Sequence, residues 1–301
     1  MTSEPIRPAD DHGSWVRPLA EALPSRWLET DRGGYTITMR ETAGAAQCLK
    51  RLEDSEAARS NARIHVGWGS FRNLDVAAAR RSDGVLLLDV NRHQRVIWET
   101  VAVVLAAPEA TSPARFAAAL AEALPDRPTS RRFIPELGQW LASDLERPQS
   151  WLCAGRPERF AHVRMLFRTG AVAIACVDLL DSAPGAPVHL LADTLASAAR
   201  GAEGRPDTLY LTNLPWMLLQ RDAFYGASEP AEALLPRRAR VQAAIGAIAA
   251  PFAHVIAAAR ETSRSAPAYR AWWTELLAPT DLDDAFWKRI PRARSPYRAL
   301  T

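Results

Sequence analysis

Residues 62–106 constrain the fold most, because this segment reads as strand, turn, helix, strand and helix in one continuous run. The apolar stretches 62–66 and 84–89 are the two expected strands. The second, Gly84-Val85-Leu86-Leu87-Leu88-Asp89, is apolar up to its last residue, as expected for a parallel strand covered on both faces. Helical patterns at 73–81 and 91–106 follow the strands. This βαβ unit predicts a parallel sheet with helical crossovers.

The rest of the chain predicts one elaborated α/β domain, a doubly wound and mainly parallel sheet of five to seven strands. Further parallel-type strands are expected at 171–177, 208–211 and 254–258. Helices are expected near 113–124, 134–145, 157–167, 188–199 and 236–249, and around Trp272-Trp273. We expect a helical N-terminal cap over 1–60, a Rossmann-like domain over 61–265 with a helical insertion at 107–168, and a helical tail over 266–301.

Composition excludes several classes of protein. The 301 residues are 48% hydrophobic and 24% charged, which is typical of a soluble globular protein. A net charge of +3 gives no support for nucleic-acid binding. The cysteines, Cys48, Cys153 and Cys176, form no C-x-x-C pair and have no histidine at metal-ligand spacing. With neither a signal-peptide pattern nor an apolar run of membrane-spanning length, we expect a cytoplasmic protein without metal or membrane, acting on a small molecule.

Two glycines follow the first expected strand, and they predict a ligand site. Gly67 and Gly69, with Trp68 between them, permit a tight turn and close approach of a ligand to the next helix N-terminus. Asp89 ends the second strand, at a spacing that brings a carboxylate to the hydroxyls of a ribose lying over the turn. The alternative is a tight turn in which Asp89 caps the next helix.

A second polar segment follows the strand at 208–211. Thr212-Asn213-Leu214-Pro215-Trp216 joins an amide, a proline and an aromatic face at the carboxyl end of a parallel strand, where open sheets bind ligands. The alternative is that Trp216 is a core residue of the next helix.

These segments together resemble the class I S-adenosylmethionine (SAM) methyltransferases, over roughly residues 61–260. Gly67 and Gly69 match the first two glycines of that family's first motif, Asp89 its ribose acid, and Asp178 its adenine-side acid. Residues 212–216 fall where the family has its post-strand catalytic motif. The resemblance implies SAM as cofactor, bound by Gly67, Trp68, Gly69, Asp89, Val90, Asp178, Leu179, Thr212 and Asn213.

The sequence departs from the family pattern at two positions. His65 stands where the family usually has an acid, and Phe71 replaces the third glycine. The ammonium of the methionine moiety therefore needs another oxygen. A dinucleotide dehydrogenase uses a similar βαβ unit, but the third glycine and a Tyr-x-x-x-Lys pair are both missing, and the only lysines are Lys50 and Lys288.

The candidate catalytic residues are Asn213 and Tyr35, and the candidate substrate-binding residues are Arg92 and Trp216. An aromatic face attracts a sulfonium cation, and an arginine such as Arg92 binds a carboxylate through two parallel hydrogen bonds. Solvent exposure of Arg92 is the alternative. The Gly33-Gly34-Tyr35-Thr36 segment predicts either a mobile lid over the site or a simple turn.

Methyl transfer to a small molecule is the function that the sequence favours. A second hypothesis keeps the site and changes the bond that breaks. Attack at the γ-carbon of the methionine moiety would give aminocarboxypropyl transfer, or closure to azetidine-2-carboxylate, with release of methylthioadenosine. A third hypothesis is a Rossmann-like binding module without catalysis.

Overall fold

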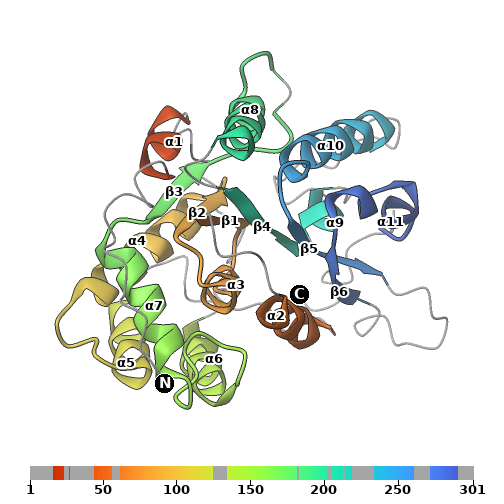
Figure 1. The fold of residues 1–301 in the computed structure, drawn as a ribbon. Helices are drawn as coiled ribbons and strands as arrows, with labels where there is room; N and C mark the ends of the chain where they lie inside the picture. Colours follow the sequence, from red (N-terminus) through yellow and green to blue (C-terminus); the bar gives the residue numbers. More distant parts are fainter. Residues whose placement is uncertain are drawn as a thin grey trace.

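A computed structural model describes residues 16–23, 27, 44–55, 62–124, 134–181, 183–201, 205–212, 214–218, 234–260 and 272–290. Within these residues the centre of the fold is one six-stranded sheet of order β3-β2-β1-β4-β5-β6 (Figure 1). Neighbouring strands are parallel except for β6, which is antiparallel to β5. The strands are β1 (Arg63–Trp68), β2 (Gly84–Asp89), β3 (Val172–Cys176), β4 (Arg205–Thr212), β5 (His254–Arg260) and β6 (Trp272–Leu277). The predicted α/β class with a doubly wound, mainly parallel sheet is confirmed.

Helices cover both faces of the sheet, with α1, α8, α10 and α11 on one face and α2 to α7 on the other (Figure 1). The helices are α1 (Val16–Ala22), α2 (Ala45–Asp54), α3 (Arg72–Arg80), α4 (Arg92–Ala106), α5 (Pro113–Ala123), α6 (Ile134–Glu146), α7 (Pro157–Arg168), α8 (Pro187–Arg200), α9 (Leu214–Leu218), α10 (Leu234–Ala249) and α11 (Asp284–Lys288), with a short 3-10 helix, η2 (Pro279–Asp281). The helical insertion predicted between the second and third strands is present as α5, α6 and α7.

Each face of the sheet has its own core, because the side chains of every strand alternate between the faces. On the α1 side, Ile64, Val66 and Leu86 pack with the apolar residues of α8 and α10. On the other side an aromatic group fills the space under α3 and α4: Phe71 lies 5.3 Å from Trp98 between ring centroids, and Trp151 stacks on Phe160 at 5.8 Å. These cores fix the turns that follow β1 and β2.

The predicted helix around Trp272-Trp273 is wrong, because this segment forms strand β6. Aromatic and β-branched residues favour strands, and here they pair antiparallel with β5, with Glu275 opposite Ala257. The pairing supplies hydrogen-bond partners to an edge that β5 would otherwise leave open. The sheet therefore extends beyond residue 265.

The described helices of the first 60 residues pack on the sheet faces. Val16 and Leu19 of α1 are buried on β2 and β3, and a methyl of Val16 occupies the space that a side chain at Gly84 would need, 2.7 Å from its Cβ position. Leu49 and Leu52 of α2 are buried on the opposite face. The Gly33-Gly34-Tyr35-Thr36 segment lies outside the described residues.

A buried arginine connects three elements near the amino ends of the strands. Arg80 of α3 is 1% exposed, and its Nε and Nη2 each donate to a carboxylate oxygen of Asp207 on β4 at 2.8 Å. Its Nη1 donates to the carbonyls of Leu52 and Ser55, at 2.9 and 3.1 Å, at the end of α2. Every nitrogen of the guanidinium therefore has a protein acceptor.

Candidate functional site

The carboxyl ends of β1, β2 and β3 place the predicted site segments side by side. The amide of Gly69 donates to the carbonyl of Leu88 at 3.2 Å, which holds the turn after β1 against the end of β2. The amide of Val177 donates to the carbonyl of Asp89, also at 3.2 Å, and joins β2 to the end of β3. The next neighbour of β1 on its other side is β4, so the strand order reverses there. Open α/β sheets bind ligands at such a switch point, outside the carboxyl ends.

The two glycines of the turn have different surroundings. At Gly67 a Cβ would lie 1.8 Å from Oδ1 of Asn73 and 2.9 Å from Cβ of Tyr210, so the protein's own side chains fill that space. Gly69 has a φ of +78°, and no atom lies within 4 Å of its Cβ position. Gly69 is therefore the glycine that faces open space, in a conformation that other residues rarely adopt.

Asp89 closes the turn after β2 with one carboxylate oxygen. Its Oδ1 accepts hydrogen bonds from the amides of Val90 and Asn91, at 2.8 and 2.9 Å. Among the described residues no donor bonds to Oδ2. The side chain is almost fully buried, and this burial raises the pKa of Asp89 to about 7 although the two amides lower it. Asp89 thus closes a tight turn ahead of α4 without capping that helix, which begins at Arg92, and its second oxygen has no partner among the described residues.

The predicted residues at the end of β3 contact the protein's own backbone and core. Asp178 is half-buried; its Oδ1 accepts from the amide of Leu180 at 2.8 Å, and burial and the charge of Asp181 raise its pKa. Burial, with the charges of Asp178 and Asp89, raises the pKa of Cys176 to about 11, so its thiol stays protonated and is a poor nucleophile. Leu179 is a core residue on the α1 face.

Trp68 belongs to the same core. Its indole nitrogen lies 3.5 Å from the carbonyl of Val177, and its ring is buried among the apolar residues of the α1 face. Trp68 therefore packs on the carboxyl ends of β1 and β3 from the α1 face of the sheet.

Gln94 on α4 is a residue that sequence reasoning missed. It is fully buried, and its Nε2 donates to the carbonyl of Gly69 at 3.1 Å. Its Oε1 is also buried and has no hydrogen-bond partner within the part of the chain that the structure describes. Only the contact with Gly69 distinguishes Gln94 from other polar residues of α4, and that contact is visible only in three dimensions.

The remaining predicted residues are placed as follows. Arg92 is exposed at the start of α4. One turn further on, Arg95 binds Glu99 at 2.6 Å and lies over the ring of Trp27, 5.7 Å from its centroid. Trp27 thus lies beside the first turn of α4. Tyr35 and Asn213 lie outside the described residues, as do the side chains of Thr212 and Trp216.

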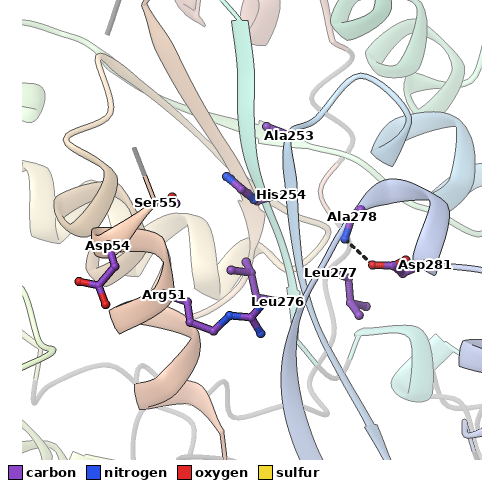
Figure 2. A pocket seen from close by; sticks show the side chains of 9 residues that line it. All are labelled: Arg51, Asp54, Ser55, Ala253, His254, Leu276, Leu277, Ala278 and Asp281. Carbon is purple, nitrogen blue, oxygen red and sulfur yellow. Dashed lines mark hydrogen bonds between the residues drawn. The ribbon is translucent and has the colours of Figure 1, made fainter. Parts of the chain in front are cut away.

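A groove of about 560 Å³ lies at the opposite edge of the sheet, where β5 begins and β6 ends (Figure 2). Arg51 extends from α2 toward Leu276, while the carboxylate of Asp281 is bound by the amide of Ala278 at 2.8 Å. Burial lowers the pKa of His254 at its floor. The lining residues are Arg51, Asp54, Ser55, Ala253, His254, Leu276, Leu277, Ala278 and Asp281. Because α/β sheets bind ligands at the carboxyl ends, we place the candidate site at Gly69 and Asp89.

Comparison with protein-family models gave no match, and comparison with curated proteins gave none either. Within the described residues no group of three or more histidine, cysteine, aspartate or glutamate side chains is arranged to hold a metal. The same residues include no helix with the length and apolar character needed to cross a membrane.

Proposed function

We propose that this protein is a SAM-dependent transferase, and that it transfers the methyl group to a small molecule. One observation carries the proposal: a buried carboxylate with an unused oxygen, Asp89, ends β2 beside Gly69, the open glycine that follows β1. A ribose brings two neighbouring hydroxyl donors, which is what an acceptor in this place requires.

The residues present fit a nucleoside ligand. The unused oxygen of Asp89 would accept from the ribose hydroxyls, and Asp178 after β3 would lie on the adenine side. Gly69 presents no side chain to the ligand. Val90, Leu179 and Trp68 would hold the bound nucleoside from beneath. Thr212, the last residue of β4, and Asn213 are proposed as further ligands of the cofactor.

Bound SAM supplies an electrophilic methyl group. The protein's part is to hold donor and acceptor in line and to exclude water, which requires few catalytic side chains. Cys176 remains a protonated thiol and is not assigned a covalent step. Arg92 and Trp216 are proposed for the substrate, and Asn213 and Tyr35 for the reacting groups.

The test is SAM binding by calorimetry, with matched carboxylate variants. Asp89→Ala should weaken binding by about 1–3 kcal/mol, because the ribose loses a charged acceptor. Asp283→Ala is the control: Asp283 also accepts from two backbone amides, those of Ala285 and Phe286, but it does so at the start of α11.

The control variant should keep the wild-type dissociation constant. If the wild-type protein does not bind SAM, or if Asp89→Ala binds it equally well, the proposal is wrong. Where turnover is measured, S-adenosylhomocysteine as product identifies methyl transfer and methylthioadenosine identifies attack at the γ-carbon.

A further inference from the structure

Three buried polar side chains form a chain of hydrogen bonds beneath the glycine turn. His65 of β1 is fully buried, its Nδ1 lies 2.8 Å from Oγ1 of Thr208 on β4, and its Nε2 lies 3.0 Å from Oδ1 of Asn73 on α3. Asn73 in turn donates from Nδ2 to the carbonyls of Trp68 and Ser70, at 3.2 and 2.9 Å. The chain therefore connects β4 to the turn through β1 and α3.

The partners fix the orientation of every group in this chain. Because Nδ2 of Asn73 faces two carbonyls, its Oδ1 must be the atom that faces His65. The imidazole then carries its proton on Nε2, and Nδ1 is left as an acceptor for the hydroxyl of Thr208. One tautomer of His65 and one orientation of the Asn73 carboxamide satisfy all of these contacts.

The same chain explains Gly67. The Asn73 carboxamide occupies the position that a side chain at Gly67 would take, so any other residue there would displace it. Both carbonyls that Asn73 binds belong to the segment in which Gly69 lies, and the backbone on either side of Gly69 is thereby held. Gly69 needs such support, because a glycine has no side chain to restrict its backbone to one conformation.

We propose that Asn73 is a positioning residue of the candidate site, held by His65 and Thr208 so that its carboxamide fixes the Trp68–Ser70 turn in the conformation that receives the ligand. The identity of the ligand, SAM, rests on the proposed function. The effect of Asn73 on the turn rests on the hydrogen bonds alone. It also gives His65 a function at the position where the methyltransferase pattern has an acid: it orients the turn through Asn73.

Thr208 offers the cleanest test, because its side chain touches neither the turn nor the open side of Gly69 in the contacts described. Thr208→Val keeps the shape and removes the hydroxyl that donates to Nδ1 of His65. Thr208→Ser keeps the hydroxyl. Ile256→Val, a buried truncation in the core shared by β5 and α2, is the control for a general loss of stability.

Two measurements are made on the full-length protein: amide hydrogen exchange at residues 68–71, and the dissociation constant for SAM. We expect Thr208→Val to speed exchange in the turn and to weaken SAM binding about five- to tenfold, the equivalent of one lost hydrogen bond. Thr208→Ser should behave as wild type in both measurements. Ile256→Val should leave turn exchange and SAM affinity unchanged.

The two proposals fail in different ways. Turn exchange in Thr208→Val no faster than in Ile256→Val would overturn the positioning role of Asn73, whatever happens to SAM affinity. A wild-type protein that does not bind SAM would overturn the proposed function. Nitrogen NMR of His65 gives a separate reading, since a proton on Nδ1 in place of Nε2 contradicts the chain of hydrogen bonds.

Discussion

Buried polar side chains have different surroundings at the amino ends of the strands and at their carboxyl ends. Near the amino ends, Arg80 and Asp207 form two direct hydrogen bonds, and the remaining guanidinium nitrogen binds backbone carbonyls. At the carboxyl ends, Asp89 is 6% exposed and Gln94 is fully buried, and each keeps an acceptor that no described residue uses. Buried polar groups are almost always satisfied. The Arg80–Asp207 pair therefore has the partners that a stabilising contact needs, whereas Asp89 and Gln94 keep acceptors that a ligand could use.

Breaking the Arg80–Asp207 pair should have the largest effect. Arg80→Met leaves the Asp207 carboxylate buried without its partner, and we expect a loss of about 3–5 kcal/mol in the free energy of unfolding. Urea denaturation followed by circular dichroism measures it. A loss below about 1 kcal/mol would show that the pair is compensated elsewhere and would remove the contrast between the two ends of the strands.

Ionisation of Asp89 should make the free energy of unfolding depend on pH. The pKa of Asp89 rises from 3.8 to about 7 on folding, so the folded carboxyl binds its proton more tightly than the unfolded one. The contribution of Asp89 to the free energy of unfolding should therefore fall as pH rises from about 4 to about 7, by up to about 1.4 kcal/mol per pH unit, and be level above that range. Asp89→Asn removes this dependence.

Subtracting the variant's unfolding free energy from that of the wild type at each pH isolates the contribution of Asp89. A difference that does not change between pH 4 and 7 would mean that the carboxyl is ionised throughout. SAM binding should tighten over the same interval, because the ribose hydroxyls bond to the ionised form.

His65 should show the opposite sign. Burial lowers its pKa from 6.5 to about 4, so the unfolded chain binds the proton more tightly, and this residue makes the free energy of unfolding rise with pH from about 4 to 6.5. The difference between wild type and His65→Gln should rise over that range and then remain constant. A falling or flat difference would contradict a neutral, hydrogen-bonded imidazole.

We expect the smallest effect from a solvent-exposed ion pair on α4. Arg95 and Glu99 are 45% and 49% exposed at their side chains, one helical turn apart. Glu99→Gln should change the free energy of unfolding by no more than about 0.5 kcal/mol, and less at high salt. Thermal melts at low and high salt measure it; a larger change would place this pair among the structural ones.

The sequence predicted the elements that local patterns specify. The expected helix 113–124 is α5 at Pro113–Ala123, where Ser112 accepts from the amide of Arg115 and a proline opens the helix. The expected strand 84–89 is β2, because an unbroken apolar run of that length needs cover on both faces. Asp89 was found from its position at the end of that run.

What failed depended on contacts that no local pattern in the sequence shows. Residues 272–277 were predicted to be helical, but they pair with β5 and form strand β6, and a partner so distant in sequence leaves no local signal. Gly67 was interpreted as room for a cofactor, but its reason is the carboxamide of Asn73. The value of Gln94 depends on the carbonyl of Gly69, which no periodicity in α4 reveals.

The contact between Cys48 and Thr274 bears on how this chain is made. The thiol of Cys48 on α2 donates to the carbonyl of Thr274 on β6 across 226 residues of sequence. Leu49 and Leu52 pack against Val76 of α3 and also against Ile256 and Leu276, so part of their apolar surface stays uncovered on the ribosome until β5 and β6 have emerged. Closing so large a loop is slow relative to local helix formation. Nascent chains that end before β6 should therefore be the forms most prone to capture by chaperones.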